Sequence, residues 1–390
     1  MFDRIQKQLD NLQSENSLRS IPSKVDRGAD LWLDCGPQRC LNLASNNYLG
    51  LAADPRLKEA AIRAIKELGT SSGASRLVSG QYRLYSELES TTARFKDQES
   101  ALVVGSGYAA NLSILTALAG RKTAVFSDRQ NHASIVDGCI LARCKQIRYR
   151  HLDTDHLRHL LHHYKDHAEK IIITDTVFSM DGDLAPLEGL IRMARDSGAL
   201  LVVDEAHATG IFGKGRGLAA ELGVANEVDV HMGTFSKALG SQGGYIAARR
   251  DIIRLIISKA RAFIYSTALP PAVIAASLAA LEHVRDHPEK GKRLLQTARN
   301  VAGFLRETGF AAGPGHSQII PVIIGPNRET LQAAETLRHR GVYAPAIRPP
   351  TVPQNTARLR LSLRADLSDK DVDFLKKAFL NLYFGAGPSG

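Results

Sequence analysis

Short apolar runs alternate with amphipathic segments through the middle of the chain. Runs of the strand type lie near 101–104, 123–127, 147–150, 170–175, 199–204 and 228–232. Segments with helical periodicity separate them, such as the one from Pro186 to Ser197, which ends before Gly198. Because strands that alternate with helices pair in parallel, this pattern predicts an α/β fold with helices on both faces of a mostly parallel sheet.

The pattern differs at the two ends of the chain. Apolar residues predict an N-terminal helix that lies on another surface, at Phe2, Ile5, Leu9 and Leu12. The stretch LWLDCGPQRCLNL then predicts a short hairpin. After an alanine-rich helix the expected order is helix 288–308, strand 317–324, helix 327–340, strand 357–363 and a helix from Ser368. We expect three parts: an N-terminal helix and hairpin segment (1–45), a large domain (46–286) and a small C-terminal α+β domain (287–390).

Four predicted strands end in a small or acidic residue, namely Gly105, Asp128, Asp175 and Asp204. The carboxyl ends of parallel strands meet at one edge of a sheet, which is where open α/β sheets bind ligands. We therefore expect these residues to converge on a single rim.

The strand LLVVDEAHATG and the loop GTFSKALGSQGG carry the most specific chemistry. Asp204 follows five apolar residues, His207 comes three positions later, and Lys237 lies in a glycine-punctuated loop. A lysine amine can condense with the aldehyde of pyridoxal phosphate, and an ionised carboxylate can keep the pyridine nitrogen protonated. His207 would then bind the ring hydroxyl, with Thr234 and Ser236 at the phosphate. The combination predicts pyridoxal phosphate as cofactor.

A second ligand is compatible with the segment ALVVGSGYAANLSIL. Gly105, Gly107 and Ala110 fit G-x-G-x-x-A after a strand, and Asp128 ends the next strand, as in a dinucleotide site. The same helix start can hold the phosphate of pyridoxal phosphate equally well. A dinucleotide site would leave Asp204 and Lys237 without a role, so we favour pyridoxal phosphate.

Histidines raise two further possibilities. His132 lies at a strand-to-helix junction, where its ring could cover a flat cofactor or could simply cap the helix. Five histidines occur on a predicted helix, at His156, His159, His162, His163 and His167. Three of them repeat at i, i+4 and i+8 and could chelate a metal. No acid or thiol is built around them, so a solvated face is favoured and no metal site is predicted.

Composition excludes several classes of protein. With 390 residues, 44% hydrophobic and 23% charged, the chain is typical of a globular protein. The N-terminus lacks the apolar core of a secretory signal, and no uncharged run would span a bilayer. Four cysteines without C-x-x-C spacing indicate reduced thiols in the cytoplasm. The net charge of +10 is scattered among acids, which argues against nucleic acid and favours either solubility or attraction to an anionic thioester carrier.

These motifs together resemble the α-oxoamine synthase family of fold-type I pyridoxal-phosphate enzymes. The resemblance covers nearly the whole chain, through LNLASNNYLGL, GASRLVSG, SGYAAN, NHAS, FSMDGDLAPL, DEAHATGIFGKGRG, GTFSKALGSQGGY, YSTALPP, RPPTVP and RLRLS. It implies a seven-stranded sheet and a homodimer with active sites at the interface. Tyr85 departs from the pattern, since relatives commonly carry histidine there.

The resemblance also implies residue roles. Lys237 would carry the cofactor, Asp204 would pair with the ring nitrogen, and His132 would stack on the ring. Further cofactor contacts are expected from Gly107, Tyr108, Ser179, His207, Thr234, Ser266 and Thr267, the last two from the partner chain. Substrate contacts are expected from Arg19, Asn46, Arg348, Thr351 and Arg360.

The activity implied is a decarboxylative condensation of an amino acid with an acyl thioester. GASRLVSG and the lack of long extensions favour the branch of biotin biosynthesis, which joins L-alanine to a pimeloyl thioester of coenzyme A or acyl carrier protein. Sister enzymes that make 5-aminolevulinate or that use glycine or serine are the near alternative. A dinucleotide-dependent oxidoreductase is the distant one.

Overall fold

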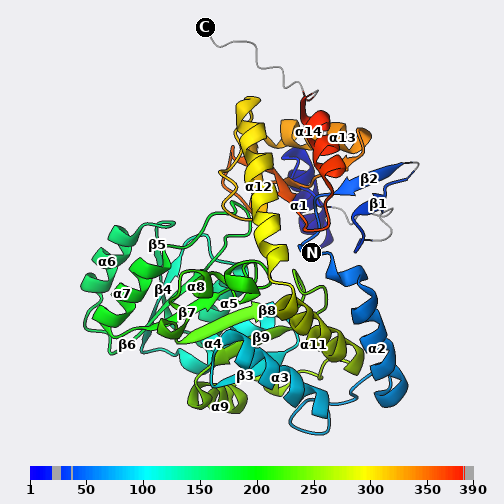
Figure 1. Ribbon diagram of the computed structural model, residues 1–390. Coiled ribbons are helices and arrows are strands. Elements are labelled where there is room, and N and C mark those ends of the chain that lie inside the picture. Colours follow the sequence, from blue (N-terminus) through cyan, green and yellow to red (C-terminus); the bar gives the residue numbers. More distant parts are fainter. Residues whose placement is uncertain (20–27, 37, 381, 383–390) are drawn as a thin grey trace. The chain divides into compact units, whose positions relative to one another are not determined.

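The computed structural model describes residues 1–19, 28–36, 38–380 and 382 (Figure 1). Contacts divide the chain into two units. The larger unit comprises Asn47–Ser179 and Asp183–Arg293. The smaller unit comprises Met1–Asn46, Met180–Gly182 and Leu294–Gly390. The chain passes from one to the other within helix α12 (Glu289–Glu307). The three-part division at residues 45 and 286 stays a prediction.

A seven-stranded sheet forms the core of the larger unit, in the order β3-β9-β8-β7-β6-β4-β5. Its strands are β3 (Ser100–Val104), β4 (Thr123–Asp128), β5 (Lys145–Tyr149), β6 (Glu169–Asp175), β7 (Leu200–Asp204), β8 (Val230–Thr234) and β9 (Gly244–Ala248). Strands β8, β7, β6, β4 and β5 pair in parallel, and β9 is antiparallel to both of its neighbours. The predicted mostly parallel sheet is confirmed.

Strand β9 is the strand of this sheet that the sequence pattern missed. Its sequence, GYIAA, directly follows the glycine-rich loop GSQG, so the apolar run is not separated from the loop by a clear boundary. All five residues are buried, because β9 lies between β3 and β8. The pairing partners decide that this segment is a strand, and the sequence does not reveal them.

Helices lie on both faces of the sheet (Figure 1). The larger unit contains α2 (Pro55–Leu68), α3 (Arg83–Lys96), α4 (Gly107–Leu118), α5 (Ala133–Ala142), α6 (Thr154–His163), α7 (Leu187–Ser197), α8 (Leu218–Glu221), α9 (Arg250–Lys259), α10 (Arg261–Ile264) and α11 (Pro271–Asp286). Short 3-10 segments add Leu51–Ala53, Gly213–Gly215 and Ala225–Glu227. Local signals set several ends: Asp54 caps α2 by accepting the Arg56 N–H at 2.9 Å, and Gly198 ends α7 with a φ of 65°.

Alternate residues of the strands pack against helices of one layer. Leu102 and Val104 of β3 join Val202 of β7 in a buried cluster with apolar residues of α4, α5, α9 and α10. This packing fixes the starts of α4 and α5 beside the carboxyl ends of the strands, where the sequence predicted a site.

The smaller unit contains two three-stranded sheets, β1-β2-β11 and β10-β13-β12. Its strands are β1 (Trp32–Asp34), β2 (Arg39–Asn42), β10 (Ile319–Gly325), β11 (Val342–Tyr343), β12 (Ala346–Ile347) and β13 (Ala357–Ser362). Its helices are α1 (Phe2–Ser14), α13 (Asn327–His339) and α14 (Asp369–Leu380), with most of α12. The predicted hairpin and small α+β fold are confirmed. Pro37 of the hairpin turn lies outside the described residues.

Two predictions about helices need qualification. The apolar stripe of α1 is exposed within this chain, and Phe2 is 85% exposed. The histidine-rich helix is shorter than predicted, because α6 ends at His163 and leaves His167 beyond it. His167 therefore does not continue the i, i+4 repeat. Among the described residues, no group of three or more His, Cys, Asp or Glu could hold a metal ion.

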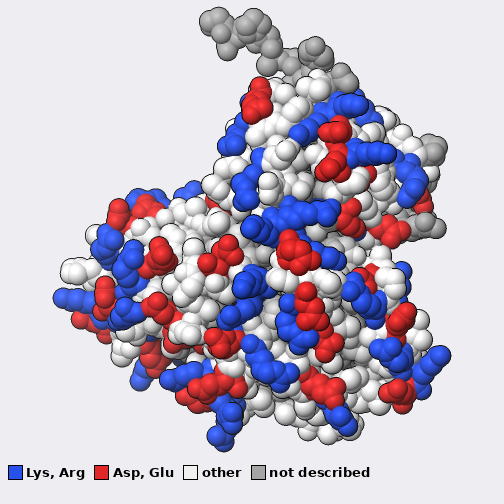
Figure 2. All heavy atoms as spheres, in the orientation of Figure 1, with Lys and Arg blue, Asp and Glu red and all other residues white. Residues whose placement is uncertain are grey.

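The surface carries charges of both signs. On the face shown in Figure 2, Lys and Arg are interspersed with Asp and Glu. Of the helices described in residues 1–19, 28–36, 38–380 and 382, none is both long and apolar enough to span a bilayer.

Candidate active site

The larger unit holds a pocket of about 200 Å³ at the carboxyl ends of its central strands. The residues that line it are Ser106, Gly107, Tyr108, Asn111, His132, Ser134, Asp175, Asp204, Ala206, His207, Met232, Thr234, Ser236 and Lys237. They come from the ends of β6, β7 and β8 and from the starts of α4 and α5. The fold therefore brings eight of the predicted site residues into one cavity: Gly107, Tyr108, His132, Asp204, His207, Thr234, Ser236 and Lys237.

Asp204 is held rigidly at the end of β7. Its Oδ2 accepts a hydrogen bond from Asn111 Nδ2 at 2.8 Å, and its Oδ1 accepts the Ala206 N–H at 2.9 Å. The side chain is only 5% exposed. Because two N–H donors point at it, the carboxylate is stabilised as an anion that can receive a cationic partner in the pocket.

A second carboxyl group lies beside it. Asp175 ends the neighbouring strand β6 in register with Asp204, and it is 3% exposed. Burial and the neighbouring charge of Asp204 raise the pKa of Asp175 well above its usual range. The raised pKa favours the protonated form of Asp175 beside Asp204.

His132 precedes helix α5 and acts as its N-cap. Its Nδ1 accepts the Ser134 N–H at 3.3 Å and lies 2.8 Å from Ser134 Oγ. The ring meets that of Tyr108 edge to face, with centroids 6.2 Å apart. Burial lowers the pKa of His132, against the opposing effect of Asp204. The imidazole is therefore neutral at neutral pH.

Lys237 and His207 enter the pocket from different loops. His207 follows β7, and its Nδ1 lies 2.7 Å from the buried hydroxyl of Tyr48. Lys237 lies in the loop between β8 and β9, which turns at Gly240 with a φ of 62°. A Cβ at Gly240 would lie 2.3 Å from Ala52 N, so only glycine fits this turn.

Hydroxyl groups and a helix start line the other side of the pocket. Thr234 Oγ1 lies 2.8 Å from Ser236 Oγ and 2.6 Å from the Gly243 carbonyl oxygen. Gly107 opens α4, and a Cβ there would lie 3.1 Å from Met232 Cε, so its lack of a side chain keeps the helix start accessible. Backbone N–H groups at a helix start suit a phosphate.

The residues present fit pyridoxal phosphate. The pocket offers an amine for the aldehyde, a buried anion for the ring nitrogen, and hydroxyls with a helix start for the phosphate. Asn111 Oδ1 is buried and has no hydrogen-bond partner among the described residues. A buried acceptor of this kind indicates that a further polar group belongs in the cavity.

Three predicted cofactor residues lie elsewhere. Ser179 is half-buried after β6 and is not among the lining residues. Ser266 and Thr267 line a separate, very small cavity with Arg76 and Tyr85. The Tyr85 hydroxyl accepts the Leu269 N–H at 2.7 Å, so this tyrosine holds the segment that follows Ser266 and Thr267.

The predicted substrate residues belong to the smaller unit and form two groups. Arg19, Arg348 and Thr351 line a pocket of about 540 Å³, where Arg19 Nη2 donates to Thr351 Oγ1 at 2.9 Å. Arg348 donates to the Asn16 carbonyl oxygen. In the second group, Arg360 is buried and donates to Asn46 Oδ1 at 3.1 Å.

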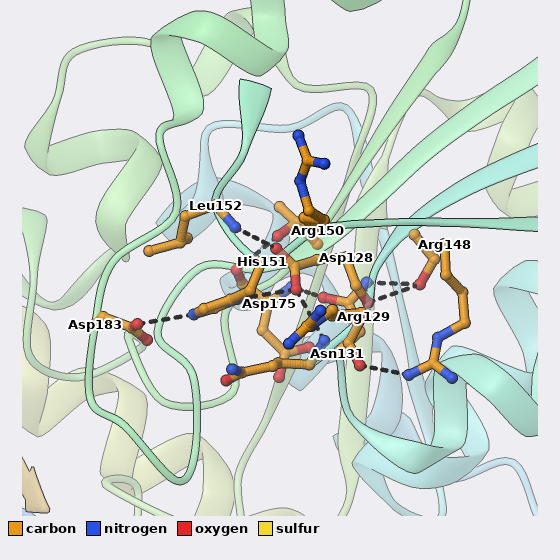
Figure 3. Close-up of polar contacts among 12 residues, drawn as sticks. Asp128, Arg129, Asn131, Arg148, Arg150, His151, Leu152, Asp175 and Asp183 are labelled. Atoms are coloured by element: carbon orange, nitrogen blue, oxygen red, sulfur yellow. Dashed lines mark hydrogen bonds and ion pairs between the residues drawn. The ribbon is translucent and has the colours of Figure 1, made fainter. Parts of the chain in front are cut away.

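Asp128 does not serve as a ribose-binding acid. As Figure 3 shows, its carboxylate accepts the Leu152 N–H at 2.9 Å and pairs with His151 Nδ1 at 2.9 Å. His151 Nε2 lies 2.8 Å from Asp183 Oδ2, so the histidine bridges two acids. Asp128 is 2% exposed and fully engaged in holding this edge of the sheet.

Sequence reasoning assigned no role to several residues that shape the pocket. Asn111 and Ser134 lie within the motifs SGYAAN and NHAS, and Asn111 is an amide in a mostly apolar helix, which was the available signal. Glu205 was also missed. It forms a fully buried ion pair with Lys96 and contacts His231 Nδ1 at 3.1 Å.

Comparisons with known proteins agree with this geometry. The family model described as aminotransferase class I and II matches residues 38–379. The chain is 52% identical over 340 residues to 8-amino-7-oxononanoate synthase from Geobacter metallireducens, with 86% of each chain covered. It is 45% identical over 390 residues to the synthase of that name from Anaeromyxobacter dehalogenans, with coverage of 100% of this chain and 98% of the relative.

The fold is shared with a solved pyridoxal-phosphate enzyme. Serine palmitoyltransferase from S. paucimobilis, with a bound adduct of pyridoxal phosphate and myriocin, superposes with a TM-score of 0.91 at 28% identity. The match covers 97% of this chain and 96% of that one. The chain therefore belongs to the aminotransferase class I and II family of pyridoxal-phosphate-dependent enzymes, and within it to the 8-amino-7-oxononanoate synthases.

Proposed function

We propose that this enzyme condenses L-alanine with a pimeloyl thioester to give 8-amino-7-oxononanoate, CO2 and the free thiol carrier, as a step of biotin biosynthesis. The observation that carries the proposal is the pocket that gathers Lys237, Asp204, His132 and His207 in a chain 52% identical to a synthase of this name. The acyl group arrives on coenzyme A or on acyl carrier protein.

Pyridoxal phosphate, when bound, supplies an electron-withdrawing ring that stabilises negative charge on the α-carbon of the amino acid. Lys237 would hold its aldehyde carbon, and Asp204 would hold its ring nitrogen in the protonated form. His132 would cover the ring, and His207 and Ser179 would contact the region of the ring hydroxyl. Gly107, Tyr108 and Thr234 would hold the cofactor, with Thr234 and Ser236 at its phosphate.

Two side chains move or hold protons in this proposal. The Lys237 amine, when it is not bound to the cofactor, would take the proton from the α-carbon of alanine, and that carbon then forms a bond to the thioester carbonyl carbon. The bond from that carbon to sulfur breaks, and the thiol leaves. The neutral His132 ring donates a hydrogen bond from Nε2 to the thioester oxygen while negative charge develops there. Loss of CO2 and return of a proton to the α-carbon complete the reaction.

The remaining contacts come from other parts of the assembly. We propose that arginines of the smaller unit bind substrate carboxylates, with Asn46 and Arg360 in one group and Arg19, Arg348 and Thr351 in the other. The enzyme acts in the cytoplasm as a homodimer, and Ser266 and Thr267 of each chain serve the active site of the partner.

The protein with Lys237→Ala tests this assignment, since it should lose both turnover and the visible absorbance of the lysine-linked cofactor. Asp204→Asn should lose turnover by more than it loses cofactor binding. Retention of both properties by Lys237→Ala contradicts the assigned pocket.

A sister reaction with serine or glycine is the second candidate, favoured by the TM-score of 0.91 with serine palmitoyltransferase. Alanine, glycine and serine should each be assayed against pimeloyl and palmitoyl thioesters of coenzyme A and of acyl carrier protein. Preference for serine or glycine, or for the long acyl chain, would replace the proposal with the sister activity.

A further inference from the structure

A continuous set of hydrogen bonds joins Asp204 to His132 through two side chains to which the proposed reaction assigns no role. Asn111 Nδ2 donates to Asp204 Oδ2 at 2.8 Å and to Ser134 Oγ at 2.9 Å. Ser134 Oγ in turn lies 2.8 Å from His132 Nδ1. Asn111 and Ser134 are completely buried, and both line the pocket.

The direction of each bond follows from the chemistry of its groups. A carboxylate only accepts, so Asn111 must turn its amide nitrogen, and not its oxygen, toward Asp204. The two amide hydrogens then serve Asp204 and Ser134. Because Ser134 Oγ already accepts one of them, its own hydrogen is directed to His132 Nδ1. The Ser134 N–H also points at Nδ1, at 3.3 Å, which makes this nitrogen an acceptor.

This arrangement decides where the His132 ring carries its hydrogen. A neutral imidazole has one N–H, and with Nδ1 accepting, the hydrogen is on Nε2. Burial, which lowers the pKa of His132, favours this neutral form. The two hydrogen bonds from Asn111 Nδ2 cost free energy of folding, because they leave Asn111 Oδ1 buried without a hydrogen-bond partner among the described residues.

We propose that Asn111 and Ser134 are positioning residues that hold His132 in its Nε2–H tautomer and tie its orientation to that of Asp204. The catalytic consequence depends on the proposed function, in which His132 Nε2 donates to the thioester oxygen. Ser134 acts on His132 directly, and Asn111 acts through Ser134 while fixing the anion that faces the cofactor nitrogen.

The test uses the cofactor-loaded full-length protein with 15N-labelled histidine. Nitrogen chemical shifts distinguish the two tautomers, and His132→Gln identifies the signals that belong to His132. In the unsubstituted protein we expect the Nε2–H tautomer. In Ser134→Ala we expect a mixture of tautomers, and a kcat for alanine and pimeloyl thioester reduced about tenfold with little change in KM.

Ser113→Ala is the matched control. Ser113 lies on α4, is fully buried, and its Oγ has no hydrogen-bond partner among the described residues, but it does not line the pocket. This variant should keep the unsubstituted nitrogen shifts and kcat. A fall in kcat as large as that of Ser134→Ala would assign the effect to helix packing and overturn the proposal.

Asn111→Leu removes the amide while keeping a similar side-chain volume. We expect it to alter the tautomer of His132 and also to shift the pH at which the absorbance of the bound cofactor changes, because Asp204 loses a donor. Ser134→Ala should leave that pH unchanged. If Asn111→Leu does not fold, Ser134→Ala still tests the proposal. The positioning role would be refuted if the His132 nitrogen shifts of Ser134→Ala match those of the unsubstituted protein.

These measurements separate this inference from the proposed reaction. If the enzyme makes no amino ketone from alanine and a pimeloyl thioester, the reaction is wrong, but the nitrogen shifts still report the tautomer. If the enzyme turns over and His132 carries its hydrogen on Nδ1, the proposed reaction is supported and the positioning role of Asn111 and Ser134 is refuted.

Discussion

The hydroxyl of Tyr48 lies 2.7 Å from His207 Nδ1, and the tyrosine side chain is completely buried. Tyr48 comes from the segment ASNNYLGL, more than 150 residues before His207 in the chain. His207 lines the pocket, so this hydrogen bond fixes the orientation of a pocket imidazole from outside the pocket.

Tyr48→Phe should therefore reduce cofactor affinity or turnover about three- to tenfold, and stability by about 1 kcal/mol. The phenyl ring keeps the packing and removes only the hydroxyl. The measurements are steady-state kinetics, cofactor titration and urea unfolding.

A matched control is Tyr245→Phe. Tyr245 is equally buried, and its hydroxyl lies 2.7 Å from Thr209 Oγ1, but it does not line the pocket. Tyr245→Phe should lower the free energy of unfolding by a similar amount and leave turnover unchanged. Equal kinetic effects of the two changes would show that Tyr48 acts through general packing.

The buried ion pair between Lys96 of α3 and Glu205 predicts a large effect on stability. Their side chains are 2% and 0% exposed. Glu205 also accepts the Ala219 N–H at 3.1 Å. Lys96→Met would leave a buried carboxylate without its cation, which should lower the free energy of unfolding by about 3–5 kcal/mol.

The same helix offers a control on its exposed face. Arg83 pairs with Glu87 at 2.8 Å, and the arginine side chain is 92% exposed. Arg83→Met should cost about 0.5 kcal/mol or less, because solvent screens such pairs. A loss below 1 kcal/mol for Lys96→Met in urea unfolding would contradict the view that this pair is essential to the core.

Local signals predicted much of this fold. Apolar runs located six strands of the central sheet, and Gly198 marked the end of a helix correctly. These features depend on residues close together in the chain. Strand β9 was missed because its burial depends on pairing with β3 and β8, which are distant in sequence.

The contrast between local sequence signals and contacts of distant residues also applies to the pocket. Asp204, His207 and Lys237 have reactive side chains in short, recognisable motifs. The roles of Asn111 and Glu205 follow only from contacts with residues about 90 and 110 positions away, such as Asn111 with Asp204 and Glu205 with Lys96. Residue type alone does not distinguish Asn111 and Glu205 from ordinary polar residues.

Asp175 provides a prediction about pH. Burial and the charge of Asp204 raise its pKa in the folded protein, so the folded state binds a proton that the unfolded state releases above about pH 4. Stability must therefore fall as pH rises from that value toward the folded pKa. Asp175→Asn, which needs no proton to be neutral, should be more stable than the unsubstituted protein, with a gap that grows with pH.

Urea unfolding of the cofactor-free protein at pH 5 and pH 8 measures this gap. Asp155→Asn changes a side chain that is 84% exposed, so its difference in stability from the unsubstituted protein should not grow with pH. If Asp175→Asn is less stable than the unsubstituted protein at pH 8, then Asp175 is ionised in the folded state and the assigned proton is wrong.

The pKa of His151 is also raised on folding, so His151, like Asp175, should make stability fall as pH rises, but in a higher range of pH. Burial alone would lower its pKa, but the hydrogen bonds to Asp128 and Asp183 outweigh burial and raise the pKa to about 9 (Figure 3). A histidine whose pKa is raised on folding contributes stability that is complete below its unfolded pKa, near 6.5, and is lost as pH rises through the folded value.

His151→Gln should therefore lower the free energy of unfolding by about 1–3 kcal/mol at pH 6, because a charged bridge between two carboxylates is replaced by a neutral amide. The difference from the unsubstituted protein should shrink between pH 8 and pH 10 in urea unfolding. His159→Gln, on the exposed side of α6, serves as the control and should change stability little at any pH. A difference for His151→Gln that stays constant from pH 6 to pH 10 would mean that His151 is neutral throughout, and that the two acids are held by hydrogen bonds without a charge.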